Sequence, residues 1–226
     1  LKFSIGLRWE DWEADYSDSL NELFNPSDNM SGGKISLIKT MTNGTNVYAS
    51  LAKGYKQGGF NLGLGLDANS TDRNLAYDPE FLINYELGIN TKLLNSKINF
   101  NGVLFYSYRE DQQVLISTQT DPSDPNTFSF LTQNAAEGVN HGLEINMDID
   151  INEFVTAFLN LGMLKTEIKN WQSRQDLEGR AQAHAPKRSY AFGLNWVPTS
   201  HTYLAIDFTG KSSFYYSDSH DNKSKS

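Results

Sequence analysis

A regular alternation of apolar and polar side chains runs from Val139 to Ile151. One side of it carries Val139, His141, Leu143, Ile145, Met147, Ile149 and Ile151, and the other carries Asn140, Gly142, Glu144, Asn146, Asp148 and Asp150. Because successive side chains of a β-strand point to opposite faces, this period of two predicts a strand with one apolar and one polar face. Soluble strands are usually about 5–6 residues long, whereas a tilted strand that spans a bilayer needs about 9–11. The length of the run therefore favours a membrane-spanning strand.

The same alternation recurs along the chain and predicts nine strands. They cover residues 1–16, 34–42, 45–57, 80–94, 97–116, 128–151, 154–171, 187–198 and 202–216, with some irregularity expected at Ala135-Ala136. Short reversals are predicted near residues 43, 95, 152 and 199. The first of them, Asn43-Gly44, is typical of a type I′ hairpin turn because both residues accept positive φ. Long polar loops are predicted over 17–33, 58–78, 117–127 and 172–185.

The connection lengths predict a sheet with two different ends. In an up-and-down antiparallel sheet every second connection lies at the same end, so the short turns gather at one end and the long loops at the other. Bacterial outer-membrane barrels have this asymmetry, together with aromatic belts at the two interfaces. Aromatic residues do lie near the ends of the predicted strands, namely Trp9, Trp12, Tyr106, Tyr108, Trp171, Trp196 and Phe214-Tyr215-Tyr216.

We therefore predict an all-β fold, in which the chain is an antiparallel up-and-down segment of a transmembrane β-barrel. A soluble β-sandwich or β-solenoid explains the alternation but predicts neither the aromatic ends nor the one-sided loops. Nine strands left open would expose two unpaired backbone edges to lipid. The chain also begins at Leu1, within a predicted strand and without an initiator Met. We accordingly expect a segment of a longer protein.

Composition excludes several classes of protein and site. The net charge of −8 argues against a nucleic-acid partner, which requires clustered Lys and Arg, and the absence of Cys excludes disulfides and thiolate metal sites. The four histidines show no metal-ligand spacing, and neither a phosphate-binding glycine motif nor a nucleophile elbow is present. We expect no enzymatic activity, and no catalytic, metal-binding or cofactor-binding residue.

Two stretches resemble the barrel of TonB-dependent outer-membrane receptors. The first is Val47-Tyr48-Ala49-Ser50-Leu51-Ala52-Lys53-Gly54-Tyr55-Lys56-Gln57-Gly58-Gly59-Phe60-Asn61, followed by Tyr77-Asp78-Pro79-Glu80 and Asn84-Tyr85-Glu86-Leu87-Gly88. The second runs from Asn134 to Glu144 and ends in Gly142-Leu143-Glu144. The order of these segments is similar to that family over essentially the whole chain.

The resemblance implies a 22-stranded barrel in the outer membrane of a Gram-negative bacterium, with lipid on its outer face. It also implies an N-terminal plug domain inside the barrel and uptake of a small-molecule nutrient, energised by the inner-membrane TonB complex. Residues 1–226 would be a partial barrel domain that lacks the plug and the final strands. The nutrient would be a ferric siderophore, a cobalamin-like ligand or a glycan. The alternatives are a passive porin, another structural barrel, or a soluble surface adhesin built of long hairpins.

The wall of an external ligand vestibule is the predicted functional site. Arg109, Asp111 and Gln113 are expected on the inward face just above the tyrosines that end the apolar band, and Tyr55 is assigned to the same vestibule. Gly54, Gly58 and Gly59 are interpreted as structural, at a transition from strand to loop. Glu86 and Glu144 lie on the polar face, where we expect them to pair with Arg or Lys.

Overall fold

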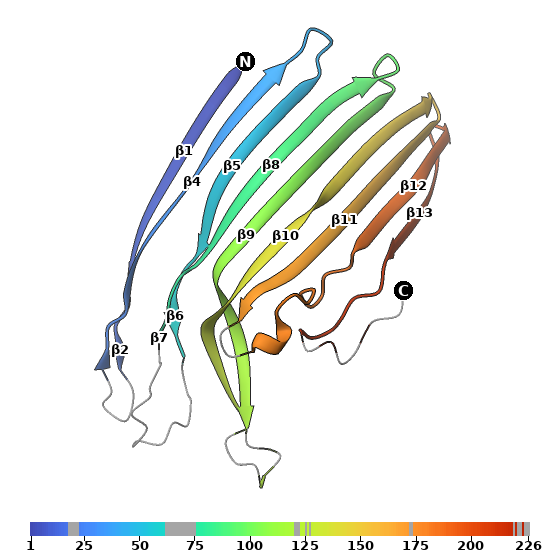
Figure 1. Ribbon diagram of the computed structural model, residues 1–226. Coiled ribbons are helices and arrows are strands. Elements are labelled where there is room, and N and C mark those ends of the chain that lie inside the picture. The colour runs from blue at the N-terminus through green and yellow to red at the C-terminus, as the bar shows by residue number, and fades with distance from the viewer. Residues whose placement is uncertain are drawn as a thin grey trace.

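The computed structural model describes residues 1–17, 23–61, 76–119, 123, 124, 126, 128–171, 174–218, 220 and 223. Among these residues, nine long strands form one antiparallel sheet in the order β1-β4-β5-β8-β9-β10-β11-β12-β13. Their bounds are β1 (Lys2–Glu13), β4 (Ser27–Thr40), β5 (Asn46–Lys56), β8 (Glu80–Leu93), β9 (Ile98–Gln119), β10 (Phe128–Asn152), β11 (Val155–Trp171), β12 (Arg188–Thr199) and β13 (Thr202–Lys211). The predicted all-β, up-and-down antiparallel fold is confirmed (Figure 1).

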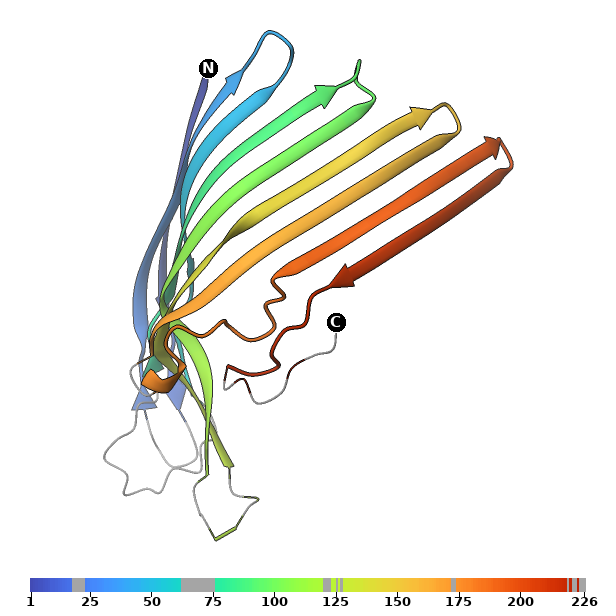
Figure 2. The ribbon, with the colours of Figure 1, turned by 45° about the vertical axis from the view of Figure 1, so that its right-hand side comes forward.

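The two ends of the sheet differ, as the connection lengths predict. The short turns lie at the upper end of the sheet in Figure 1, and the long connections lie at the lower end. Short elements occur within the long connections, namely β2 (Tyr16–Ser17), β3 (Leu23–Phe24), β6 (Gly59–Phe60), β7 (Ala76–Tyr77) and a 3-10 turn, η1 (Gln175–Leu177). The hairpin of β9 and β10 extends beyond the lower ends of its neighbours (Figure 2).

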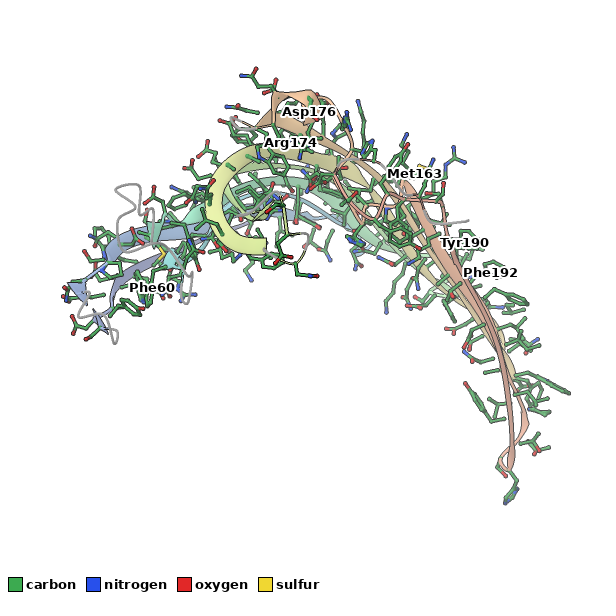
Figure 3. All side chains as sticks on the ribbon, turned by 90° about the horizontal axis from the view of Figure 1, so that it is seen from below. Phe60, Met163, Arg174, Asp176, Tyr190 and Phe192 are labelled. Carbon is green, nitrogen blue, oxygen red and sulfur yellow. The ribbon has the colours of Figure 1, made fainter. Side chains whose placement is uncertain are left out.

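Register across the sheet separates two faces. One set of partners is apolar and consists of Leu37, Ala49, Leu87, Leu104, Leu143 and Met163. A second row of partners, on the opposite face of the same strands, is mostly polar and consists of Lys34, Ala52, Asn84, Ser107, Asn140 and Thr166. Figure 3 shows the sheet as an arc, with Met163, Tyr190 and Phe192 on its convex side. We call the convex, apolar side the outward face and the concave side the inward face.

Most of the apolar side chains on the outward face are not covered by the described chain. Leu87 and Leu104 are each 53% exposed, and Met163 is 54% exposed. A soluble sheet of this size buries such a face, since each fully buried leucine stabilises the fold by about 1.5–3 kcal/mol. The outward face therefore needs an apolar environment outside the chain.

Gly142 allows β10 and β11 to approach each other. A Cβ at this position would overlap the carbonyl oxygen of Met163 and would lie 2.9 Å from Cζ of Phe105. We predict that Gly142→Ala lowers the free energy of unfolding by about 3 kcal/mol, the upper end of the usual cost of overpacking, because a backbone atom of a paired strand cannot move aside. Gly6→Ala is the matched control, since a Cβ at Gly6 meets nothing within 4 Å. Urea titration in detergent measures both, and equal effects would contradict this register.

The prediction of a loop over 17–33 is wrong for residues 27–33, which belong to β4. Glu13 pairs with Ser27, and Gly32 and Gly33 lie within the ladder opposite Arg8 and Leu7. Residues 31–33 lie beside the apolar band of β1, since Ser31 is opposite Trp9, but they carry no apolar side chain of their own. Residues 27–29 extend past that band, opposite residues 11–13, so the alternation disappears over this part of β4. The two glycines are required by close backbone approach: a Cβ on Gly33 would lie 2.7 Å from the carbonyl oxygen of Gly6.

Two predictions near the end of the chain also need correction. The strand predicted over 202–216 ends at Lys211. Trp171, assigned to the interfacial belt, is instead buried with Ala136, Ile168 and Leu177. A register shift places Trp171 opposite Ala136 while Ile168 stays opposite Gly138, so one extra residue in β11 turns the indole to the other face. Trp9 and Trp196, in contrast, are 71% and 43% exposed.

Candidate functional site

An ion pair joins the start of β8 to β9 at the long-loop end of the sheet. Nε of Arg109 donates to Oε1 of Glu80 at 2.9 Å, and a second guanidinium nitrogen contacts the same oxygen. The backbone amide of Gln113 donates to the other oxygen, Oε2, at 3.0 Å. Glu80 is only 6% exposed, so its charge depends on these three donors.

A bulge in β9 produces this arrangement. Asp111 has φ of 52°, in the left-handed region, where Asn, Asp and His are the residues other than Gly that occur most often. On its two sides Arg109 pairs with Gly138 and Gln112 with Ala136, and the ladder to β10 is irregular between them. The irregularity predicted at Ala135-Ala136 therefore lies opposite a bulge that the sequence pattern did not reveal. The side chain of Asp111 stays exposed.

Side-chain amides tie the neighbouring connection to this bulge. Nε2 of Gln113 donates to the carbonyl oxygens of Gln57 at 2.8 Å and Asp78 at 3.1 Å. Nδ2 of Asn134 donates to the carbonyl oxygens of Asp78 and Asp111 at 2.7 and 2.8 Å. The amide of Asp78 donates back to Oδ1 of Asn134 at 2.6 Å. These bonds fix the ends of β5, β8, β9 and β10 as one rigid wall.

The structure thus brings three of the four predicted vestibule residues together and leaves Tyr55 elsewhere. Arg109 and Gln113 meet at Glu80, and Asp111 lies between them in the chain. Tyr55 instead donates from its hydroxyl to Oε2 of Glu10 at 2.8 Å, and Cζ of Arg8 lies 5.4 Å from its ring centroid. Tyr55, Glu10 and Arg8 thus form a second polar group, between β5 and β1.

Sequence reasoning missed Glu80, Asn134, Asp78 and Gln57 as members of the site. All four lie within the stretches that carry the family resemblance, which is the one signal that pointed to them. Their partners are far away in the chain, since Asn134 and Asp78 are 56 residues apart. Pattern within a single strand cannot reveal such pairs.

Of the three glycines interpreted as structural, Gly58 and Gly59 are required by close contacts, whereas Gly54 shows no such requirement. A Cβ on Gly58 would overlap Oδ2 of Asp28 and lie 2.7 Å from the carbonyl oxygen of Tyr77, whereas a Cβ on Gly54 would meet nothing within 4 Å. Asp28 lies in the part of β4 that extends past the apolar band. Burial raises the pKa of its carboxyl group, and the negative charge of Asp78 raises that pKa further.

The two glutamates of the inward face do not have the partners that we expected. Glu86 accepts hydrogen bonds from Asn84 Nδ2 at 2.8 Å and Ser50 Oγ at 3.3 Å. Within the described ranges, neither Glu86 nor Glu144 forms an ion pair with Arg or Lys. Neutral donors replace the expected cations because the side chains opposite Glu86 across the sheet are Ser50 and Phe105.

The part of the chain that the structure describes has neither a cluster of metal ligands nor a membrane-spanning helix. No three His, Asp or Glu residues there lie close enough together to hold a metal ion. No helix there is long and apolar enough to cross a membrane.

Comparison with known proteins gives a family and a set of similar folds. The family described as TonB dependent receptor-like, beta-barrel matches residues 1–226. Similar solved structures include the ferric yersiniabactin uptake receptor FyuA from Yersinia pestis (18% identity, TM-score 0.71). They also include two proteins of Acinetobacter baumannii, the siderophore receptor PiuA (16%, 0.73) and the ferric preacinetobactin receptor BauA (20%, 0.71).

Each of these three alignments covers 98% of this chain but only 33%, 32% and 31% of the respective receptor. The chain therefore spans about a third of the length of the structures that it matches. At these identities the likeness shows the fold.

Proposed function

The chain belongs to the family of TonB-dependent receptor-like β-barrels, and on this premise we propose that it forms part of an outer-membrane receptor for a ferric siderophore. Members of the family are receptors and transporters of the Gram-negative outer membrane rather than enzymes. The observation that carries the proposal is the match of the family to the whole chain, together with an outward apolar face that the described chain leaves uncovered.

The two faces of the sheet support the membrane location. We propose that the convex face meets lipid and that the concave face lines the lumen, where the plug domain of the complete receptor would lie. β1 and β13 are the edges of the nine-stranded sheet, and in the complete barrel each would pair with a further strand. The TonB complex would act on a part of the receptor outside residues 1–226.

The wall around the β9 bulge is the proposed lining of the ligand vestibule. Arg109 and Gln113 shape it, since their donors are engaged by Glu80, Gln57 and Asp78. The exposed carboxylate of Asp111 is the group best placed to contact a ligand. We prefer a ferric siderophore to a cobalamin-like ligand or a glycan because PiuA is described as a siderophore receptor, and FyuA and BauA as receptors for ferric yersiniabactin and ferric preacinetobactin.

Uptake of labelled iron by the host bacterium tests the proposal. Disruption of the gene is expected to abolish uptake of one ⁵⁵Fe-labelled siderophore from a panel under iron limitation, and a protonophore is expected to do the same in the intact strain. Unchanged uptake of every siderophore after disruption would contradict the proposed ligand class. Uptake that needs this gene but survives the protonophore would instead indicate a passive porin.

A pair of variants tests the vestibule separately. Asp111→Asn is expected to weaken the apparent affinity for the siderophore about tenfold or more, since a hydrogen bond to a charged group contributes about 1.5–3 kcal/mol. Asp150→Asn removes an exposed carboxylate of β10 at the short-turn end and should leave the affinity unchanged. Equal siderophore affinities of the two variants would show that Asp111 does not contact the ligand, and would leave the proposed function untouched.

A further inference from the structure

We propose that the outward face of β8 to β12 carries a binding site for an anionic, phosphate-bearing lipid of the outer leaflet. The site is a groove of about 860 Å³ that follows two adjacent rows of outward side chains across these strands. It goes beyond the proposed transport function, and it requires only that the outward face contacts lipid.

The floor of the groove is apolar and suits acyl chains. It consists of Leu87, Leu104, Leu143 and Met163, which are direct partners across four strands. Leu87, Leu104 and Met163 are each more than half exposed, so the chain itself supplies no cover. Hydrocarbon chains lying along this row would remove that apolar surface from water.

The next row towards the long loops changes from aromatic to basic. Tyr85, Tyr106, His141 and Lys165 are successive partners in it. Ring centroids are 6.3 Å apart for Tyr85 and Tyr106, and 6.2 Å apart for Tyr106 and His141. Tyrosines at the boundary of an apolar band mark the level of lipid headgroups. The change to a cation therefore occurs at headgroup depth.

Two basic residues of the outward face, Lys165 and Arg188, lie at the β11 and β12 end of the groove. Arg188 lies directly opposite Met163, so Lys165 is its diagonal neighbour on the same face, at about 7–8 Å between backbones. Lys187 also lines the groove, but its carbonyl oxygen accepts from the amide of Leu164 at 3.0 Å, so its side chain belongs to the inward row. Figure 3 places Met163 on the convex side of the arc, which locates this cluster on the lipid side of the sheet. We call Lys165 and Arg188 the basic cluster.

The charge around the basic cluster favours an anion. Glu167 is the nearest acidic residue on the same face, two residues along β11, and it is engaged by Lys169 with an N–O distance of 2.5 Å. Lys165 and Arg188 thus face one carboxylate, which Lys169 already engages, although the chain as a whole carries a net charge of −8. Arg and Lys bind phosphate oxygens through charge-assisted hydrogen bonds, and Arg can do so bidentately. A lipid with a zwitterionic headgroup would gain less from this cluster.

Native mass spectrometry of the complete, detergent-solubilised protein tests the site. The probes are a phosphorylated lipid A and its dephosphorylated form, offered at equal concentration. Wild type is expected to retain the phosphorylated form preferentially. Lys165→Gln and Arg188→Gln should each weaken retention about fivefold, and the double variant about 25-fold, as expected for charges that act independently near an anionic headgroup.

Lys39→Gln is the matched control, because Lys39 lies on the outward face of β4, near the short-turn end and away from the groove. It should retain the phosphorylated lipid as wild type does. Urea midpoints of all variants establish that the barrel is folded. Equal retention of the two probes by wild type, or equal loss in Lys39→Gln and Arg188→Gln, would overturn the proposal. Preferential association of a second protein copy or of the dephosphorylated lipid with the groove would also overturn it. None of these outcomes depends on whether a siderophore is transported.

Discussion

Leu143→Arg and Ile145→Arg are each expected to destabilise the protein folded in a bilayer by about 2–4 kcal/mol. This is the cost of a basic side chain on the lipid face of a barrel near the midplane. Both residues lie on the outward face of β10, opposite Leu104 and Gly102 of β9. The cost arises because the guanidinium loses water in hydrocarbon without gaining a partner. Urea titration of folding into liposomes measures it.

Glu144→Arg is the matched control between these two positions. Glu144 is exposed on the inward face, opposite Val103 and Gly162. An arginine at this position would reach the water of the lumen, and we expect a change of under about 1 kcal/mol. Similar costs at all three positions would mean that both faces meet the same solvent, and the assignment to a membrane barrel would be wrong.

Removal of the Glu80 carboxylate is expected to have the largest effect on stability outside the apolar band. Glu80→Ala leaves the guanidinium of Arg109 without its partner, and breaking such a buried pair costs about 3–5 kcal/mol. It also removes the acceptor of the Gln113 amide, which holds the bulge at Asp111. Chemical unfolding in detergent is the measurement.

An exposed ion pair supplies the control for this prediction. Glu167 and Lys169 have side chains that are 29% and 43% exposed, against 8% for Glu80 and 29% for Arg109. Glu167→Ala should therefore cost no more than about 1 kcal/mol. The double variant Glu80→Ala with Arg109→Ala should be less destabilised than the sum of its single variants. Strict additivity would show that the two side chains do not interact.

The fold could be predicted because its main signal is local. Alternation from Val139 to Ile151 places each side chain on a face without any knowledge of neighbouring strands, and the turn at Asn43-Gly44 needs only two residues. The same reasoning failed at residues 27–33, where β4 carries small or polar residues both beside the apolar band of β1 and past it. With polar side chains on both faces, a strand has the composition of a loop.

The details of the site could not be predicted because they depend on pairing between distant strands. The bulge at Asp111 and the reversed face of Trp171 each arise from one extra residue relative to a neighbouring strand. Glu80 acquires its importance from Arg109, which is 29 residues away. The alternation placed Arg109 on the inward face, but it could not reveal that the guanidinium donors are engaged by Glu80.

A cysteine scan of β10 from Val139 to Ile151 tests the central claim, that one face of this sheet meets lipid and the other meets water. The chain contains no Cys, so each single substitution introduces one site for a spin label in this region. In proteoliposomes, labels at Leu143, Ile145 and Met147 should be relaxed by oxygen, and labels at Glu144, Asn146 and Asp148 should be relaxed by a water-soluble nickel chelate. Alternation with a period of two is the predicted result. Equal access of the nickel chelate to both sets would contradict the account.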